Sequence, residues 1–559
     1  MRNEMNWEPI FEYKTLSANV DPERPWLKYW PTNIPKNITF DPICIHDYVR
    51  LVAQKIPNNV AFYYIPENKK YTYREIFWYA DKVANALYEL GVRKGESVGI
   101  MTGNRPEFVF SSFGITQCGA SISPINPLLK DSDIEYILRE AGNINTIFVH
   151  KSNYRVIKKA KQSIEFDNII LLGTDQPKDD AITFEQLIQD KDPVSPQVNI
   201  DPLTDLAALL FTGGTTGLPK GVMLTHNNLV ADALCSINME KERYEKEFGR
   251  AVALGILPLC HTFGFETLII ALAAGSMLLL YNSFDPAQIL ADIEQYRIRL
   301  FAGIPLIFNL LIQHPDFKKR DLSSLQASVS GSAPLPPEWA RKWEQGTGGS
   351  KIGMGYGLTE TSPITHIQPL WLPEKKLESI GIPIIDTDAK IVDPITLNEL
   401  EPGQVGELLI KGPQVMKGYW KKPEATARVI LEGGWLRTGD LARMDDLGYF
   451  YIEGRTKDMI KYKGYKVMPQ EIEEKLCEHP AILEVGVVGI PDPNIGETIK
   501  AFIVLKKEYH GKVKEEEIIQ WAKDKLAGYK YPRKVEFLNS LPRTPVGKIF
   551  RRKLREKEE

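Results

Sequence analysis

Residues 211–221, FTGGTTGLPKG, combine residue types that bind phosphate groups. Glycines let backbone N–H groups point into a turn, threonine hydroxyls add donors, and Lys220 adds a positive charge. The segment follows the apolar run 206–210 and precedes a predicted helix that Thr225 caps. It is not a Walker loop, because Lys220 follows Gly217 by three residues and precedes another glycine. We predict a phosphate-binding turn; a flexible surface loop is the alternative.

A second glycine-rich segment, GMGYGLTET at 353–361, carries an aromatic ring and two oxygen-bearing side chains. Tyr356 offers a face on which a purine could stack. Thr359 and Glu360 follow it by three and four residues, and a hydroxyl with a carboxylate suits a phosphate and its Mg²⁺. The segment misses the dinucleotide fingerprint GxGxxG, and a plain tight turn explains it equally well in isolation, as it does SGSAPLP at 330–336.

Three further residues give weaker signals. Asp440, in LRTGDLA, is predicted in a turn, where it either forms an Asx-turn or helix cap or accepts both hydroxyls of a ribose. His261, in PLCHTFGF, is by itself more typical of a core or capping histidine than of a catalytic one. Lys548 lies on a Pro/Gly-bounded turn before a basic segment that fits a solvated positive tail.

The elements that must position these residues alternate between helical and strand-like patterns, which favours a parallel α/β sheet. Helices are predicted at 73–90 and after Asn104. Strands are predicted at 97–101, 120–125, 146–150, 169–173 and 206–210.

The pattern changes near Gly454. A short helix that Pro469 opens, two strands at 482–489 and 498–505, and a helix that Gly528 caps indicate a compact α+β lobe. We therefore predict two domains, residues 1–454 and 455–559.

Composition describes an ordinary globular protein. The 559 residues include 69 Lys and Arg against 72 Asp and Glu, with 43% apolar and 25% charged residues. This composition disfavours a disordered tail protein, a collagen and a nucleic-acid coat. The five cysteines form no CxxC pair and no zinc-type spacing with histidine, which favours a reducing, cytoplasmic setting without disulfides or a structural metal. The longest apolar stretch, 267–281, is too short to span a bilayer. Peripheral membrane contact and a homodimer stay open.

Together and in this order, the segments resemble the adenylate-forming superfamily of acyl-CoA synthetases, firefly-type luciferases and peptide-synthetase adenylation domains. The resemblance rests on FTGGTTGLPKG, GYGLTET, GWLRTGD, GRTKDMIKYKGYKVMPQEIE and PRTPVGKIFRRKL, and runs from Tyr71 to Lys548. It implies an α/β fold: a large N-terminal lobe of two doubly wound subdomains plus a distorted β-barrel, and a small mobile α+β C-terminal lobe with its hinge near Lys457.

The same resemblance implies a role for each matching residue. The ATP phosphates would be held by Thr212, Gly213, Gly214, Thr215, Thr216, Gly217 and Lys220. The adenine would be held by the segments with Gly331, Ser332, Ala333, Gly355, Tyr356 and Gly357. The ribose would be held by Asp440 and Arg455. Thr359 would contact the α-phosphate, Glu360 and Thr216 would bind Mg²⁺, and Lys548 would bridge the substrate carboxylate and the α-phosphate. A carboxylate that attacks phosphorus brings two anions together, so preorganised positive charge is what such a reaction needs.

The second half-reaction would attach the acyl group to the thiol of coenzyme A. By resemblance, rotation about Lys457 would withdraw Lys548 and bring in the loop from Lys461 through Lys463 to Gly464, which would form the pantetheine tunnel. Lys461 would assist thioester formation and His261 would open the tunnel.

The acyl pocket would be lined by apolar residues and glycine: Phe265, Ile304, Pro305, Phe308 and Gly355. Gly213 in place of the usual serine is similar to long-chain fatty-acyl-CoA synthetases, and TFGFE lacks the aspartate of amino-acid-activating domains. The sequence therefore predicts an AMP-forming ligase for a medium- to long-chain fatty acid that uses ATP, Mg²⁺ and coenzyme A. A ligase for an aryl or a short hydroxy or branched acid, a luciferase-like oxygenase, and a protein that only binds nucleotide are the alternatives.

Overall fold

The eight-stranded sheet contains the strand that leads into the glycine-rich turn. The computed structural model describes residues 13–15, 23–212, 218–455, 458–463, 465–492, 495–543 and 549–557. The strand order of the eight-stranded sheet is β22-β11-β10-β6-β5-β7-β8-β9. The strands are β5 (Ser97–Met101), β6 (Ser121–Pro124), β7 (Ile144–His150), β8 (Asn168–Leu172), β9 (Ile182–Thr183), β10 (Leu206–Phe211), β11 (Gly221–Thr225) and β22 (Gly418–Tyr419). The run from β10 to β9 is parallel, whereas β11 and β22 are antiparallel additions at one edge.

A seven-stranded sheet has the order β16-β15-β14-β12-β13-β3-β4 and is parallel except at β3–β4. Its strands are β3 (Val60–Tyr64), β4 (Lys69–Thr72), β12 (Val252–Gly255), β13 (Met277–Leu280), β14 (Leu300–Gly303), β15 (Ala327–Ser330) and β16 (Lys351–Met354). The predicted alternation of strands and helices is thus confirmed in two doubly wound sheets.

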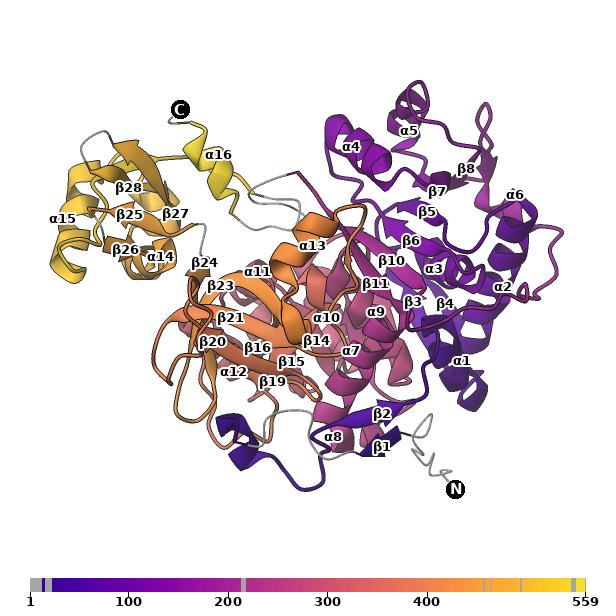
Figure 1. The fold of residues 1–559 in the computed structure, drawn as a ribbon, viewed down its shortest axis with the longest axis horizontal. Coiled ribbons are helices and arrows are strands. Elements are labelled where there is room, and N and C mark those ends of the chain that lie inside the picture. The colour runs from indigo at the N-terminus through magenta and orange to yellow at the C-terminus, as the bar shows by residue number, and fades with distance from the viewer. Residues whose placement is uncertain are drawn as a thin grey trace. The chain divides into compact units, whose positions relative to one another are not determined.

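Helices pack on these sheets, and Figure 1 shows α4, α5 and α6 beside the β7–β8 end of the eight-stranded sheet. Long periodic helices match their predicted ranges: α2 begins after Thr72, whose capping box with Glu75 fixes its start. The helices of this part are α1 (Ile45–Lys55), α2 (Tyr73–Glu89), α3 (Pro106–Gln117), α4 (Asp131–Ala141), α5 (Tyr154–Ala160), α6 (Phe184–Ile188), α7 (His226–Met239), α8 (Lys241–Glu247), α9 (Thr262–Ala273), α10 (Pro286–Tyr296), α11 (Pro305–Gln313), α12 (Pro337–Gly346) and α13 (Pro423–Val429). Among them α1, α7 and α9 pack against one another.

The remaining strands form smaller sheets. A pair joins β1 (Tyr13–Thr15) to β2 (Ile38–Phe40), a three-stranded sheet joins β17 (Tyr356–Gly357), β18 (Ile364–Ile367) and β19 (Ile382–Pro383), and a four-stranded sheet joins β20 (Asp388–Val392), β21 (Gly406–Lys411), β23 (Leu436–Met444) and β24 (Phe450–Arg455).

The C-terminal region has its own sheet and core. The strand order of this sheet is β26-β25-β28-β27, with β29 beside β28. The elements of the region are β25 (Ile460–Tyr462), β26 (Tyr465–Val467), α14 (Pro469–Cys477), β27 (Ile482–Asp492), β28 (Gly496–Leu505), α15 (Glu515–Lys525), β29 (Lys534–Phe537) and α16 (Arg551–Arg555). Ile472, Val487 and Ile518 lie fully buried between this sheet and its helices. A mixed α/β region and a small α+β region confirm the predicted fold class.

Two compact units divide the described chain. The first comprises the residues up to Thr212, Pro219–Asp388 and Ile410–Leu436; the second comprises Leu218, Ala389–Leu409 and the residues from Arg437 onward. The sequence-based boundary at 454/455 stays a prediction.

Three local expectations differ from the structure. Residues 221–225 form strand β11, so the glycine-rich turn joins two antiparallel strands rather than a strand and a helix. Asp440 lies within strand β23 and not in a turn. Helix α15 ends at Lys525 because Leu526 is already extended, so Gly528 is not its cap.

Candidate active site

The base of the glycine-rich turn is closed by two hydrogen bonds. Thr212 donates its N–H to the carbonyl of Lys220 at 3.0 Å, and the N–H of Lys220 donates to Oγ1 of Thr212 at 3.3 Å. The predicted phosphate-binding residues Gly213, Gly214, Thr215, Thr216 and Gly217 lie outside the described residues. The turn therefore starts and ends at the predicted threonine and lysine.

Lys220 and Glu360 lie on either side of one tyrosine. The Lys220 ammonium lies 4.7 Å from the ring centroid of Tyr419, and the Tyr419 hydroxyl donates to Oε1 of Glu360 at 2.8 Å. Burial, and then the negative charge of Glu360, raise the pKa of Tyr419 well above its usual range, so the phenol stays a neutral donor. Glu360 thus has a neutral hydrogen-bond donor as its neighbour, and a carboxylate is the donor type that Mg²⁺ prefers.

Tyr419 was not predicted as a site residue. It comes from strand β22, which pairs with β11 at Val222, and the N–H of Met416 donates to the carbonyl of Glu360 at 2.9 Å. No spacing in a single sequence indicates that positions 360 and 419 meet.

The segments predicted to hold adenine follow two adjacent parallel strands. Ser330 pairs with Met354, so the residues after β15 and β16, including Gly331 and Gly355, leave the sheet at the same edge. A crevice at the carboxyl ends of such strands is where open α/β sheets bind ligands.

Sterics explain the glycines of this region. A Cβ at Gly357 would lie 1.7 Å from the carbonyl oxygen of Pro363, and one at Gly331 would lie 2.9 Å from the ring of Phe263. Ser332 has a positive φ of 69°, and Ala333 follows it. The backbone of Pro363 leaves no room for a side chain at Gly357, whereas a side chain at Gly331 would require the Phe263 ring to shift.

Tyr356 and the turn after it are fixed by the three-stranded sheet. The Tyr356 ring meets that of His366 edge to face at 5.8 Å, and Thr365 donates to the carbonyl of Tyr356 at 3.2 Å. Thr359 and Glu360 lie in a 3₁₀ turn, Thr359–Thr361. The predicted aromatic, hydroxyl and carboxylate thus come from one continuous segment that the adjacent strand β18 braces.

The predicted acyl-pocket residues are mainly buried. Phe265 in α9 is fully buried and meets Phe108 edge to face at 6.3 Å, and His261 precedes α9 with its Nε2 3.1 Å from Nδ2 of Asn126. Phe308 packs in an aromatic cluster, 4.8 Å from Phe301 between ring centroids. Ile304 and Pro305 start α11, one turn before Phe308.

The second unit holds the predicted ribose-binding pair. Asp440 in β23 pairs in register with Arg455 in β24, and Nε of Arg455 lies 2.9 Å from Oδ1 of Asp440. The Asp440 side chain is only 5% exposed, and its N–H donates to Oγ1 of Thr438 at 3.1 Å. Its charge is already compensated by an arginine.

The loop predicted to line the pantetheine tunnel is a hairpin tip. Lys463 is exposed at the turn between β25 and β26 with a φ of 49°, and its ammonium lies 5.6 Å from the ring centroid of Tyr462. Lys461 lies in β25 and pairs in register with Lys466. The described residues do not include Lys457, Gly464, Lys548 or the side chain of Lys461. On either side of the segment with Lys548, Arg543 and Ile549 pair with each other.

Comparison with known proteins identifies the family of the chain. Residues 49–420 match the family described as AMP-binding enzyme, and residues 471–548 match the AMP-binding enzyme C-terminal domain. A long-chain-fatty-acid–CoA ligase of Bacillus subtilis (strain 168) is 38% identical over 96% of this chain and 98% of its own length.

Solved structures are similar over most of the chain. ATP-bound MatB from Rhodopseudomonas palustris has a TM-score of 0.83 at 28% identity, covering 92% of this chain and 99% of that one. The anthranilate CoA ligase AuaEII in complex with anthranoyl-AMP has a TM-score of 0.83 at 29% identity, covering 92% and 97%.

The chain belongs to the AMP-binding enzyme family. It is an AMP-forming acid–CoA ligase, and that predicted class of enzyme is confirmed. Within the residues described, no helix is both long and apolar enough to cross a membrane.

Proposed function

We propose that the enzyme activates a medium- to long-chain fatty acid with Mg²⁺-ATP and transfers the acyl group to coenzyme A. The observation that carries the proposal is the Lys220–Tyr419–Glu360 arrangement, in which an ammonium group and a carboxylate share one neutral phenol. A cation and a metal-binding anion side by side suit a polyphosphate with its Mg²⁺. The ATP-bound relative supports ATP as the nucleotide.

In the first half-reaction, a carboxylate oxygen of the acid bonds to the α-phosphorus as the bond to the leaving pyrophosphate breaks. Lys220 and the turn from Thr212 would bind the phosphates, Thr359 would contact the α-phosphate, and Glu360 would hold Mg²⁺, which neutralises phosphate charge. The acyl-adenylate then stays bound; the anthranoyl-AMP complex of a relative supports such an intermediate.

In the second half-reaction, the thiol of coenzyme A loses its proton, its sulfur bonds to the acyl carbon, and AMP leaves. We propose that residues 455–559 form a mobile domain that turns about Lys457 between the steps. Lys548 would serve adenylation, while Lys461, Lys463, Gly464 and His261 would serve the thiol.

The fatty-acid substrate rests on two supports. The buried side chain of Phe265 is apolar, and the Bacillus subtilis relative at 38% identity is a long-chain-fatty-acid ligase. An aryl acid is the second candidate, because the anthranilate ligase matches the fold with a TM-score of 0.83 at 29% identity. A one-methylene difference changes selectivity by only about 1–3 kcal/mol, so the acid must be found by assay.

The test is acid-dependent AMP formation from Mg²⁺-ATP across short- to long-chain fatty acids, hydroxy acids and aryl acids, with and without coenzyme A. We expect turnover in one chain-length window with a strict requirement for coenzyme A. Turnover with aryl acids alone would overturn the fatty-acid proposal. Oxygen consumption or light with an acyl-adenylate would instead favour the luciferase-like alternative.

The division of labour has its own test. Lys548→Ala should abolish adenylate formation and spare thioester formation from supplied acyl-adenylate. Equal loss of both steps would contradict the proposed roles.

A further inference from the structure

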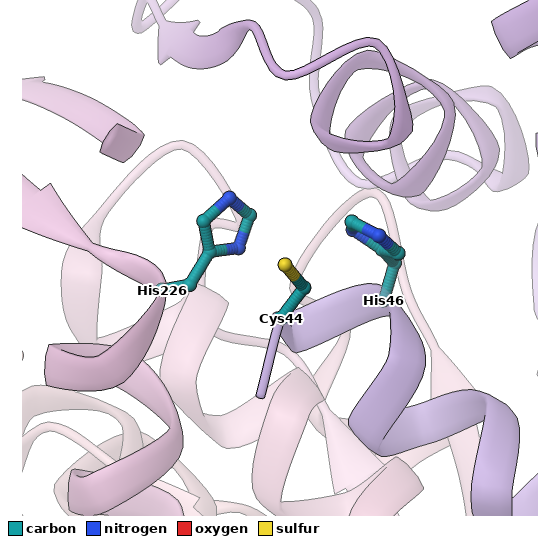
Figure 2. A group of neighbouring side chains, drawn as sticks. All are labelled: Cys44, His46 and His226. Carbon is teal, nitrogen blue, oxygen red and sulfur yellow. The ribbon is translucent and has the colours of Figure 1, made fainter. Parts of the chain in front are cut away.

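One cysteine thiol and two histidine rings lie close together in the interior of the first unit, at the starts of helices α1 and α7. Neither helix holds any of the proposed reacting groups. Figure 2 shows Cys44, His46 and His226 with the thiol between the two rings. One ligand atom from each residue lies within 4.8 Å of the others, and all three residues are buried. Cysteine thiolate and imidazole are the donors that Zn²⁺ selects in proteins.

The fold brings the cluster together from two helix starts. Cys44 is the residue before α1 and His46 is its second residue, whereas His226 is the first residue of α7. Thr225 and Asn228 form a capping box that fixes the start of α7, and α1 packs against α7. The positions of all three side chains are therefore set by regular structure.

The hydrogen bonds of His46 assign its proton. Thr116 donates its hydroxyl to helix carbonyls of Ser112 or Phe113, so it accepts from Nδ1 of His46 at 3.1 Å. Neutral His46 then has a lone pair on Nε2, which lies 3.6 Å from a carboxylate oxygen of Asp47. Two acceptors that face each other are unfavourable unless a cation or proton is shared between them.

His226 is not a fully hydrogen-bonded core histidine. Its Nδ1 accepts only a long bond, 3.3 Å, from the N–H of Ile45, and among the described residues its Nε2 has no partner. Figure 2 shows the ring nitrogen nearer its Cβ turned toward the sulfur of Cys44. His46 thus keeps a lone pair on Nε2, and a metal bound at Nδ1 of His226 would replace its long hydrogen bond from Ile45.

The surrounding charges favour a cation. The carboxylates of Asp47, Asp205 and Asp201 act on Cys44, and Lys94 acts on it in the opposite direction. A divalent ion at Cys44 would be stabilised by these three carboxylates.

We propose that Cys44, His46 and His226 bind one Zn²⁺ ion that ties α1 to α7. Tetrahedral zinc places its ligand atoms about 3.3–3.8 Å apart, so side chains at 4.8 Å need to close by about 1 Å. A pocket of about 460 Å³ lined in part by Cys44, His46 and Asp47 gives an entry path, and Asp47 or a water molecule completes the coordination. The ion is structural and takes no part in ligation of the acid.

The first test is metal stoichiometry. The full-length protein is stripped with a chelator, dialysed against Zn²⁺ and analysed for bound metal; we expect one equivalent, and loss of it in Cys44→Ser. Cys235→Ser is the matched control, because Cys235 is a buried cysteine of α7 outside the cluster, and it should keep the ion. Binding that is absent, or that is equal in Cys44→Ser and wild type, would overturn the proposal.

A second test separates ligation from folding. Co²⁺ in place of Zn²⁺ should give a sulfur-to-metal charge-transfer band in wild type and Cys235→Ser but not in Cys44→Ser. Thr116→Val should weaken Zn²⁺ binding by about 10–100-fold because it releases the His46 ring, while Thr116→Ser retains the hydroxyl and the affinity. Equal weakening in both Thr116 variants, or a charge-transfer band in Cys44→Ser, would contradict the assigned ligands.

Discussion

Two carboxylates of the proposed nucleotide site are held in opposite ways. Glu360 accepts a hydrogen bond from the neutral phenol of Tyr419, whereas Asp440 is buried in an ion pair with Arg455. The first has a neutral partner and is of the donor type that a metal ion prefers, and the second has its charge compensated by the protein itself. The difference suggests that Glu360 acts through its charge and Asp440 through its position and hydrogen bonds.

The largest expected effect is therefore at Glu360. Glu360→Gln keeps the size of the side chain and an oxygen that can accept from Tyr419, but it removes the charge that would hold Mg²⁺. We expect the rate of acid-dependent ATP–pyrophosphate exchange to fall by about 10²–10³-fold, the size typical for loss of one electrostatic contact to a transition state. A Mg²⁺ titration should show a higher half-saturating concentration; an unchanged titration with unchanged rate would remove Glu360 from the metal site.

Asp440→Asn should have a smaller effect that appears mainly in the KM for ATP. The variant loses hydrogen bonds made by a charged group, worth about 1.5–3 kcal/mol, and leaves Arg455 without its charge partner. This corresponds to about a 10–100-fold rise in KM with a kcat near that of wild type. A loss confined to kcat would show that the two carboxylates do not differ as proposed.

Part of the proposed nucleotide site could be predicted from local sequence, whereas the rest depends on contacts between residues far apart in the chain. Glu360 was predictable because Tyr356, Thr359 and Glu360 share one short segment. Tyr419 was not, since it reaches Glu360 only through the pairing of β22 with β11. In the same way, no spacing along the chain relates Cys44 to His226.

Local signals also misled where tertiary pairing overrode them. Thr-Gly-Asp predicted a turn at Asp440, and Gly439 does have a positive φ of 70°, yet pairing with β24 carries the strand through it. The short segment 221–225 gave no separate strand signal before Thr225, although it pairs along its whole length with β10. The start of α2 was accurate because both its apolar periodicity and the cap at Thr72 are local.

Glu266 extends the comparison to a carboxyl group with no partner. It is fully buried in α9, and among the described residues both of its oxygens lack a hydrogen bond. Burial, and then the nearby charge of Asp232, raise its pKa well above the usual range, so the folded state takes up a proton. The contribution of Glu266 to stability is then fully present below the ordinary carboxyl pKa of about 4.3 and is lost as the pH rises through the folded-state value.

Glu266→Gln should remove the part of the pH dependence that Glu266 contributes, while the buried Asp232, whose pKa burial also raises, keeps its own part. We expect little change in the free energy of unfolding near the ordinary carboxyl pKa, and a gain of about 1–3 kcal/mol at pH 8 because the variant buries no group that must lose its charge. Urea unfolding of both proteins across this pH range measures the difference. Glu424→Gln, at an exposed position of α13, is the control and should change neither value. A variant less stable than wild type at high pH would mean that Glu266 is charged and paired in the fold.

The smallest expected effect is that of Tyr419→Phe. The variant keeps the ring next to Lys220 and removes only the hydroxyl that donates to Glu360. One such bond is worth about 1 kcal/mol, so exchange activity should fall by less than about tenfold and the half-saturating Mg²⁺ concentration should rise by a similar factor. Tyr451→Phe, which removes a tyrosine–aspartate bond of 2.9 Å to Asp445 in the second unit, should leave both quantities unchanged. If Tyr419→Phe were as inactive as Glu360→Gln, the phenol would have a role of its own at the phosphates, and Glu360 could no longer be described as a charge that its neighbour merely positions.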